Sequence, residues 1–368
     1  MIRLLIVVGT RPNYIKVTRF KKVAEEKFKT KFDIKIVHTG QHFDKAMADD
    51  FFRQLDIYPD FSLNIPRNSA NNQIGEIMIR LEEVINTFQP HLILVPGDVN
   101  STLAAAITAN KMGIPLGHLE SGLRSCDRTM PEEINRLLVD EITDYFFVTE
   151  QSGIDNLIKE GKPQNQIHFV GNTMIDTLVA FEDAIKSQSV IEDYELVANA
   201  FILMTIHRPA TVDHKEGLEQ LYTLLKAITQ KHTVVFPMHP RTLNNITKFD
   251  LKADFDNLKQ LVITGPLDYF SFQNLIHHCK MVLTDSGGIQ EETTFKLKPC
   301  LTLRPNTERP ITITEGSNTL LDFDIAEIME HIETIDQNRY KDSAVPQFWD
   351  GKATERILEV IENLGHTS

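Results

Sequence analysis

The chain has 368 residues, 42% of them hydrophobic, so its length favours two domains, each with enough apolar residues to fill a core. The formal net charge of −13 argues against general nucleic-acid binding, which needs a basic surface. The three cysteines, Cys126, Cys279 and Cys300, lack metal or redox spacing and suit a reducing compartment such as the cytoplasm. The apolar run Leu4–Val8 is too short to span a bilayer and lacks a signal-peptide cleavage region, which predicts a first strand and no membrane anchor.

In the first half of the chain, short β-branched runs alternate with amphipathic stretches, the pattern of an α/β fold. The predicted strands are Leu4–Val8, Asp33–His38, Leu92–Val95, Ile114–His118, Tyr145–Val148 and Ile167–Val170. The helices predicted between them are Lys16–Lys27, Asp44–Leu55, Asn72–Phe88, Ser101–Met112, Pro131–Glu141 and Gln151–Glu160.

The second half repeats this alternation. Its predicted strands are Phe201–Thr205, Thr233–Pro237, Leu261–Thr264, Met281–Thr284 and Cys300–Leu303. Its predicted helices are Glu216–Gln230, Tyr269–His277, Gly288–Phe295 and, after a loop containing Pro346 and Trp349, Gly351–Leu364. We therefore expect two Rossmann-like, doubly wound domains, 1–171 and 172–350, joined near Gly171–Asp176, with the C-terminal segment 351–368 packing back on the first.

The most informative segment follows the strand Met281–Thr284. Ser286, Gly287 and Gly288 put backbone N–H groups and a helix N-terminus at the carboxyl end of that strand, an arrangement that favours phosphate. The two glycines allow a diphosphate to approach the backbone, and a carboxylate such as Glu292, further into the helix, suits ribose hydroxyls. An isolated Ser-Gly-Gly would more often be an ordinary helix N-cap, so the remaining strand exits decide between these interpretations.

Cations and carboxylates collect at the strand exits of the first half. Arg11 and Lys16 open a helix whose dipole repels cations, which favours an anionic ligand over ordinary surface charge. Asp98 and Glu120 each follow a strand, and Glu132, beside Glu133, opens a further helix. Singly, these acids would be caps or dipole partners. Together at one rim they raise one another's pKa, which suits proton transfer.

The second half supplies histidine and arginine at its strand exits. His207 and His239 each lie next to or near an arginine after a strand, and Arg304 and Arg309 follow the last predicted strand. Such groups recognise phosphate. If the carboxyl ends of the two sheets face each other, the active site is the cleft between the domains, and a nucleotide-linked substrate spans it. His277, next to His278 and Cys279, lacks metal-site spacing, so no metal site is expected.

Several ordered motifs across nearly the whole chain resemble the non-hydrolysing UDP-N-acetylglucosamine 2-epimerases. They are GTRP (9–12), TGQH (39–42), GDVNSTLA (97–104), GHLESGLRS (117–125), MPEEINR (130–136), HR (207–208), TDSGGIQEE (284–292) and TERP (307–310). The resemblance implies two Rossmann-like domains, as in type-B glycosyltransferases, a homodimer, a UDP-sugar in the interdomain cleft, and service in an envelope or capsule polysaccharide pathway of bacteria. It also implies inversion at C2 through UDP elimination, a glycal intermediate and re-addition, with no cofactor and no metal.

The resemblance also implies roles for individual residues. The catalytic set comprises Asp98, Glu120 and Glu132, assisted by Lys16 and His207. The substrate-binding set comprises Arg11, Ser286, Gly287, Gly288 and Arg309 for the diphosphate, Glu292 for ribose, Phe272 near uracil, and the cleft cations Arg136 and Arg241.

The chain departs from the family pattern at several positions. Asn13 stands where many members have glutamate, and Pro209-Ala210 replaces the end of an HRRE motif. Gln41 and His42 match residues near an allosteric site, but Asp44 replaces a glutamine, so activation by a second substrate molecule is not implied. These changes leave room for a modified substrate, a UDP-linked diacetamido uronic acid or deoxy sugar. Three other classes remain open: a type-B glycosyltransferase, a hydrolysing epimerase and a non-catalytic nucleotide-sugar sensor.

Overall fold

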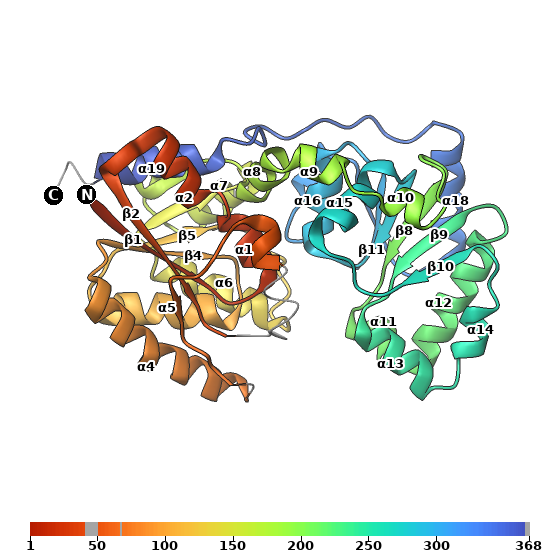
Figure 1. Cartoon of the computed structure of the whole chain (residues 1–368), viewed down its shortest axis with the longest axis horizontal. Helices are drawn as coiled ribbons and strands as arrows, with labels where there is room; N and C mark the ends of the chain where they lie inside the picture. Colours follow the sequence, from red (N-terminus) through yellow and green to blue (C-terminus); the bar gives the residue numbers. More distant parts are fainter. Residues whose placement is uncertain (41–50, 67, 365–368) are drawn as a thin grey trace. The chain divides into compact units, whose positions relative to one another are not determined.

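The computed structural model describes residues 1–40, 51–66 and 68–364, and it divides the chain into two compact units. Unit 1 comprises Met1–Ala180 and Gln347–Ser368, and unit 2 comprises Phe181–Pro346. Each unit contains one parallel sheet with helices on both faces (Figure 1). This architecture confirms the predicted pair of doubly wound α/β sheets.

The seven-stranded sheet of unit 1 has the order β3-β2-β1-β4-β5-β6-β7, and its strand pairs are parallel. Its strands are β1 (Ile2–Val8), β2 (Phe32–His38), β3 (Phe61–Ser62), β4 (Leu92–Pro96), β5 (Leu116–Leu119), β6 (Tyr145–Val148) and β7 (Ile167–Phe169). The central strands are mostly apolar because both faces of the sheet are covered, and Arg3 in β1 and His118 in β5 are exceptions. The order reverses between β1 and β4, where an open sheet of this kind binds its ligand.

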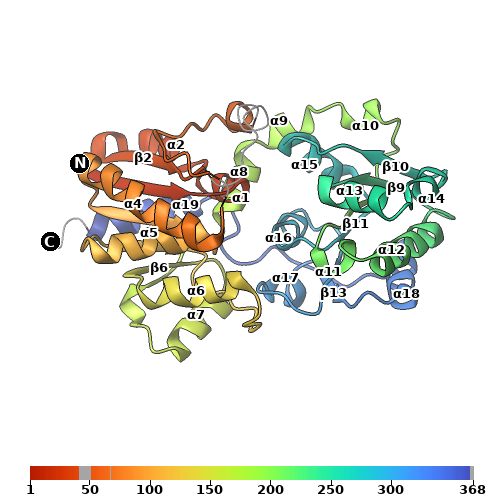
Figure 2. The same cartoon turned by 90° about the horizontal axis from the view of Figure 1, so that it is seen from below.

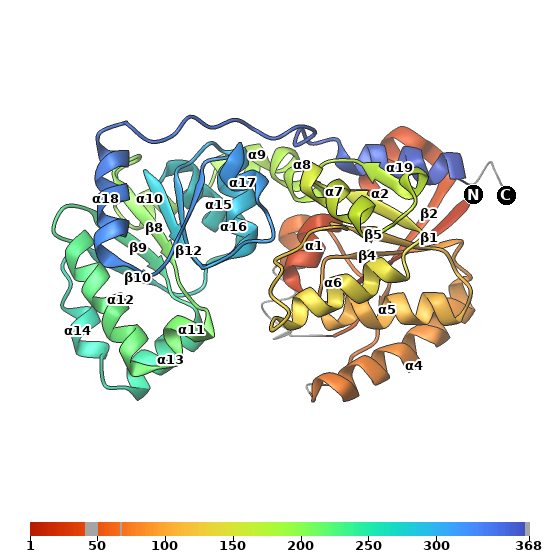
Figure 3. The same cartoon turned by 180° about the vertical axis from the view of Figure 1, so that it is seen from behind.

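The α-helices of unit 1 lie on both faces of its sheet. They include α1 (Arg11–Val17), α2 (Phe20–Val23), α4 (Ala70–Phe88), α5 (Asn100–Lys111), α6 (Pro131–Glu141), α7 (Gln151–Lys159), α8 (Thr173–Ala180) and α19 (Ala353–Leu364), and residues 51–55 are also helical. Helices α4, α5 and α6 cover one face, and α2, α8 and α19 the other (Figure 3). The predicted helix Lys16–Lys27 is helical over most of its length but is not continuous: it is divided among the end of α1, α2 and a π-helical turn at Ala24–Phe28. Helix α1 begins earlier, at Arg11, with Pro12 in its first turn.

The six-stranded parallel sheet of unit 2 has the order β10-β9-β8-β11-β12-β13. Its strands are β8 (Phe201–Thr205), β9 (Thr233–Pro237), β10 (Leu261–Thr264), β11 (Met281–Thr284), β12 (Cys300–Leu303) and β13 (Asn318–Leu321). Its helices are α9 (Glu182–Lys186), α10 (Val190–Asp193), α11 (Pro209–Val212), α12 (Lys215–Ile228), α13 (Pro240–Lys248), α14 (Lys252–Asp256), α15 (Tyr269–His278), α16 (Gly287–Phe295), α17 (Ile311–Thr314) and α18 (Ile325–Asp336) (Figure 2).

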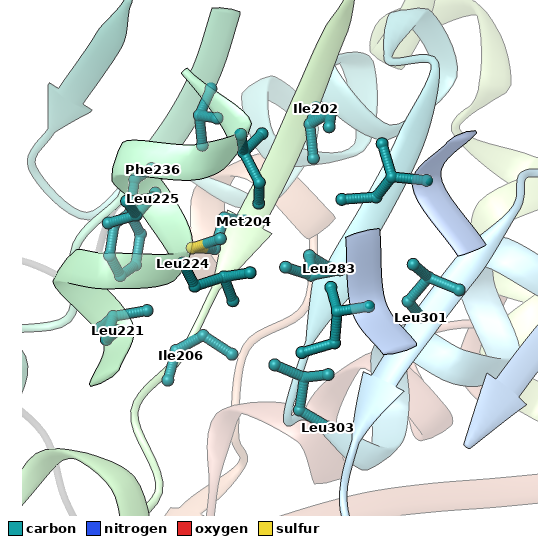
Figure 4. Packing of buried hydrophobic residues seen from close by; sticks show 14 of the residues in the cluster. Ile202, Met204, Ile206, Leu221, Leu224, Leu225, Phe236, Leu283, Leu301 and Leu303 are labelled. Carbon is teal, nitrogen blue, oxygen red and sulfur yellow. The ribbon is translucent and has the colours of Figure 1, made fainter. Parts of the chain in front are cut away.

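One of the core clusters of unit 2 contains residues of this sheet and of α12. Met204 of β8 and Leu283 of β11 meet Leu221 and Leu224 of α12, and all four are fully buried (Figure 4). Burying a leucine side chain is worth about 1.5–3 kcal/mol, so this layer holds β8 and β11 firmly. The loops after these two strands carry the candidate phosphate-binding groups.

The C-terminal segment is anchored in unit 1. Trp349 is buried and its Nε1 donates to the carbonyl oxygen of Thr149 at 3.1 Å. The Asp176 carboxylate in α8 accepts from the backbone N–H groups of Ala353 at 3.0 Å and Thr354 at 2.6 Å, at the start of α19. Helix α8 belongs to unit 1, whereas the predicted boundary at residue 171 lies before it. None of the helices in the described part of the chain is long and apolar enough to cross a membrane.

Candidate active site

Strand order brings the predicted acid and base residues of unit 1 together. Strands β1, β4 and β5 are neighbours, so the loops at their carboxyl ends lie side by side. These loops lead to Lys16 in α1, to Asp98 after β4 and to Glu120 after β5. The position is the reversal point of the sheet, where a ligand site is expected.

Lys16 and Glu120 form a buried ion pair. The Lys16 Nζ lies 2.7 Å from the Glu120 Oε2, and the two side chains are only 7% and 4% exposed. A Cβ added to Gly97, which has φ of +68°, would lie 3.3 Å from that Nζ and 3.9 Å from that Oε2, so little space remains for a side chain there. Glu120 itself has φ of 67°, an unusual left-handed conformation that occurs more often at functional sites.

Asn13 ties the β1 loop to the end of β4. Its Oδ1 accepts from the backbone N–H groups of Gly9 at 3.3 Å and Thr10 at 3.2 Å, and its Nδ2 donates to the carbonyl oxygen of Pro96 at 3.3 Å. An ionised carboxylate could not donate to Pro96. The amide at this position therefore suits the loop geometry of this chain.

The two acids that open α6 have different environments. Glu133 is buried and accepts from the backbone N–H groups of Ser125 at 2.9 Å and Cys126 at 3.0 Å, so it holds the loop before α6. Its Oε2 also accepts from Arg136 Nη1 at 2.9 Å. Glu132 is exposed, and within 1–40, 51–66 and 68–364 its carboxylate has no partner. Glu132 is therefore the acid of this pair that is open to a ligand.

Arg136 positions Asp98. Its Nη2 lies 2.5 Å from the Asp98 Oδ2, while the Asn135 Nδ2 donates to the Asp98 carbonyl oxygen at 2.8 Å. Arg136 was predicted as a ligand-binding cation, but it is buried between Asp98 and Glu133, and these carboxylates compensate its charge. Arg11 is half-buried with its guanidinium carbon 5.6 Å from the centre of the Phe51 ring, and burial lowers its pKa.

In unit 2, Asp285 orients the His207 loop. Its carboxylate accepts from the backbone N–H groups of His207 and Arg208, both at 2.7 Å, and its Oδ1 lies 2.9 Å from His207 Nδ1. Burial alone would raise the pKa of Asp285, but these His207 and Arg208 contacts lower it, so the carboxylate is held ionised. The His207 side chain remains 42% exposed, which leaves it accessible to a ligand.

The Ser286 loop begins α16. Ser286 occupies the N-cap position in an extended conformation, but its side chain makes no capping hydrogen bond. The first backbone N–H groups of α16 therefore have no side-chain cap, as an anion-binding helix N-terminus requires. A Cβ on Gly287 would lie 2.9 Å from Glu308 Oε1 and 3.1 Å from Arg309 Nη1, so glycine is needed for this close approach.

Buried arginines surround this loop. Arg309 was predicted to hold the diphosphate, but it pairs with two carboxylates: its Nε lies 2.8 Å from the Glu291 Oε2, and its Nη1 contacts Glu308. Arg304 is also buried, with its Nη2 3.2 Å from the Glu308 Oε2. Burial lowers the pKa of Arg304, the Glu308 carboxylate acts in the opposite sense, and the nearby charges of Arg208 and Arg309 lower it further. This crowding of cations suits an anionic ligand.

A pocket of about 280 Å³ adjoins the same loop. Three predicted site residues line it, namely His207, Phe272 and Ser286. The other lining residues are mostly apolar and include Met238, His239, Pro266, Leu267 and Ile289. An aromatic ring on an apolar wall beside an anion-binding turn suits a nucleobase next to its phosphates.

A model of the UDP-N-acetylglucosamine 2-epimerase family matches residues 24–362. The chain belongs to this family. It is 37% identical over 365 residues to the UDP-N-acetylglucosamine 2-epimerase of Methanocaldococcus jannaschii, covering 98% of each chain. It is 36% identical to the UDP-2,3-diacetamido-2,3-dideoxy-D-glucuronate 2-epimerase of Pseudomonas aeruginosa, covering 98% of this chain and 100% of that protein.

A solved structure of this family has the same fold. The Methanocaldococcus jannaschii UDP-GlcNAc 2-epimerase in complex with UDP-GlcNAc and UDP superposes with a TM-score of 0.89 at 35% identity. The match covers 98% of this chain and 100% of the other. Two parallel α/β domains are therefore the family fold, and this chain has both of them.

The remaining predicted residues lie in varied surroundings in this epimerase-family chain. Glu292 is buried in α16, and desolvation raises its pKa to about 7, although Gln273 and Tyr269 act in the opposite sense. Arg241 is exposed and pairs with Asp213, its Nε lying 2.7 Å from the Asp213 Oδ1, so it is a surface ion pair. The predicted allosteric residues Gln41 and His42 lie outside the described residues.

Proposed function

We propose that this protein is a non-hydrolysing UDP-N-acetylglucosamine 2-epimerase, which interconverts UDP-N-acetylglucosamine and UDP-N-acetylmannosamine. A base removes the C2 proton, the C1–O bond breaks with departure of UDP, and a C1–C2 double bond forms. Protonation of C2 from the opposite face and return of UDP to C1 complete the inversion. The observation that carries this proposal is the pair of carboxylates Asp98 and Glu120 after neighbouring strands of one sheet, together with Glu132 on the helix whose Arg136 binds Asp98, a set that a nucleotide-sugar sensor would not need.

The carboxylates of unit 1 are equipped for different proton-transfer roles. Glu120 is held by Lys16, Asp98 by Arg136, and Glu132 is exposed on the first turn of α6. Two proton-transfer groups held on separate elements can act on opposite faces of one carbon. This arrangement supports an acid and a base in the same turnover.

Unit 2 is equipped for the leaving group. The negative charge that develops on UDP as the C1–O bond breaks would be stabilised by the N-terminus of α16, by His207 and by the arginines beside Gly287. Asp285 fixes His207, so little reorganisation is needed when that charge develops. The reaction transfers no hydride, and the proposal needs neither a redox cofactor nor a metal.

A modified UDP-sugar is the second candidate substrate. The diacetamido-glucuronate epimerase of Pseudomonas aeruginosa is almost as similar to this chain as the Methanocaldococcus jannaschii enzyme. We further propose a homodimer in the cytoplasm that supplies a polysaccharide pathway, which is the usual setting of the family.

The proposal is tested by proton NMR of the purified protein with UDP-N-acetylglucosamine in D₂O. We expect UDP-N-acetylmannosamine to appear with deuterium at C2. Lasting release of UDP and free N-acetylmannosamine would replace the proposal with a hydrolysing epimerase. An unchanged spectrum, together with turnover of the UDP-linked diacetamido uronic acid, would identify the second candidate as the substrate.

The affinity for UDP is expected to depend on pH through Glu292. Ribose hydroxyls donate to the ionised carboxylate, whereas burial raises the pKa of this group in the unliganded protein to about 7. Below pH 7, Glu292 is therefore mostly protonated, and UDP binding must release that proton. The affinity for UDP should fall by up to roughly tenfold for each pH unit below 7 and level off above it. Calorimetric titration with UDP between pH 5.5 and 8.5 measures this. A Glu292→Gln variant should lose the part of this dependence that comes from Glu292 and keep only the part from the terminal phosphate of UDP, whose second pKa is about 6. An unchanged slope would remove Glu292 from the ribose site.

A further inference from the structure

A buried histidine in unit 1 joins two of the elements that carry the carboxylates. His118 lies in β5 and is fully buried. Its Nε2 lies 2.8 Å from the carbonyl oxygen of Gly97, and its Nδ1 lies 2.7 Å from the Asp140 Oδ1 in α6. A carbonyl oxygen only accepts hydrogen bonds, so the Nε2 donates to Gly97. The imidazole therefore connects the end of β4 to α6 across β5.

Asp140 extends this connection to the loop after Glu120. Its Oδ2 accepts from the backbone N–H of Gly122 at 3.0 Å and lies 2.7 Å from Arg124 Nη2. Asp140 is 1% exposed, and burial alone would raise its pKa, but His118 and Arg124 lower it. The carboxylate is thus ionised and bound by three different groups.

Every contact in this network lies close to a proposed catalytic carboxylate. Gly97 immediately precedes Asp98, and His118 and Gly122 lie two residues on either side of Glu120. Asp140 lies on α6, the same helix as Glu132. We propose that His118 and Asp140 form a positioning pair that fixes the separation of Asp98 and Glu120, a role that rests on the proposed function.

The surroundings of Gly97 show why the separation of Asp98 and Glu120 would depend on the His118–Asp140 pair. Its carbonyl oxygen is held by His118, while on its Cα side the Lys16 Nζ lies 3.3 Å from the position of an added Cβ. Releasing the carbonyl would allow the Gly97–Asp98 loop to move relative to the Lys16–Glu120 pair. A displacement of about 1 Å in a reacting constellation can lower turnover about 10²-fold.

The test is the full chain with His118→Gln, studied by the same D₂O assay. We expect kcat to fall about 10- to 100-fold, the usual effect of losing a supporting hydrogen bond around reacting groups, while KM and the affinity for UDP change less than about threefold. Because the proposed reaction needs proton-transfer groups on opposite faces of C2, we also expect a change in the ratio of deuterated starting sugar to deuterated epimer, measured at early times before the two sugars reach equilibrium. A role in folding alone would not change this ratio.

His168→Gln is the matched control, because His168 is a partly buried histidine in β7 of the same sheet, and among the described residues its Nε2 has no hydrogen-bond partner. It should leave both kcat and the deuterium ratio unchanged.

Asp140→Asn is the second test variant, because it keeps the side-chain volume of Asp140. It should change the deuterium ratio in the same way as His118→Gln, and it takes the place of that variant if His118→Gln does not fold. Equal losses in the His118 and His168 variants, or an unchanged ratio in both the His118 and Asp140 variants, would overturn the positioning role alone. Wild-type protein that binds UDP without epimerising any UDP-sugar would overturn the proposed function together with it.

Discussion

Replacing Glu120 with glutamine is expected to lower epimerase turnover by about 10²- to 10⁴-fold, the range typical of a lost acid or base group. The amide cannot exchange a proton at neutral pH, and it leaves the Lys16 ammonium, at 2.7 Å in the native protein, without its counter-charge. The affinity for UDP should remain within about threefold, because the Ser286 loop and the pocket lined by His207 and Phe272, which we propose to bind UDP, belong to unit 2. Turnover is measured by the D₂O assay and UDP affinity by calorimetry.

Glu141→Gln provides the matched control for this charge change. Glu141 ends α6, its side chain is 74% exposed, and it pairs with Lys162 at 2.6 Å. This variant removes one negative charge from the same unit, and we expect its turnover to equal that of the native protein. If Glu120→Gln retained more than about a tenth of the native rate, Glu120 would not be a proton-transfer group. A parallel loss of UDP affinity would instead indicate damage to the fold.

Much of the fold could be predicted from the sequence because parallel strands buried on both faces are continuous apolar runs. The bounds predicted for β6 and for β8 to β12 agree with the structure. The two strands that were missed, β3 (Phe61–Ser62) and β13 (Asn318–Leu321), lie at sheet edges, where the chain is short or polar. Helix α8 was missed because Gly171–Asp176 suggested a linker, although α8 starts at Thr173.

The sequence predicted the parts of the candidate site that directly follow strands, but not the contacts between side chains. Placing polar residues after strands located the loops of Asp98, Glu120, His207 and Ser286 correctly in their sheets. The sequence could not show which acidic groups would compensate the charges of Arg136, Arg241 and Arg309, because those partners depend on tertiary packing. The sequence also assigned no role to Asp285, because its contacts with the His207 loop depend on the pairing of β8 with β11.

Gly171→Ala is expected to destabilise the protein by about 2–5 kcal/mol, the sum of a left-handed backbone penalty and overpacking. Gly171 has φ of +89°, and an added Cβ would lie 2.0 Å from the Phe348 carbonyl oxygen. That backbone cannot move away easily, because the adjacent Trp349 is buried and bonded to Thr149 at 3.1 Å. Arg356 of α19 also fixes the backbone next to Gly171, because its Nη1 donates to the Val170 carbonyl oxygen at 3.0 Å. Urea unfolding of the full chain measures the loss.

Gly161→Ala separates the two contributions. Gly161 also has a left-handed backbone, with φ of +82°, but nothing lies within 4 Å of an added Cβ. This variant should lose only the backbone penalty of about 1–2 kcal/mol. The difference between the two variants then measures how tightly the segment that ends in α19 is held against unit 1. Equal losses would mean that Phe348 moves aside at little cost, and that Trp349 and Arg356 do not fix the C-terminal segment in place.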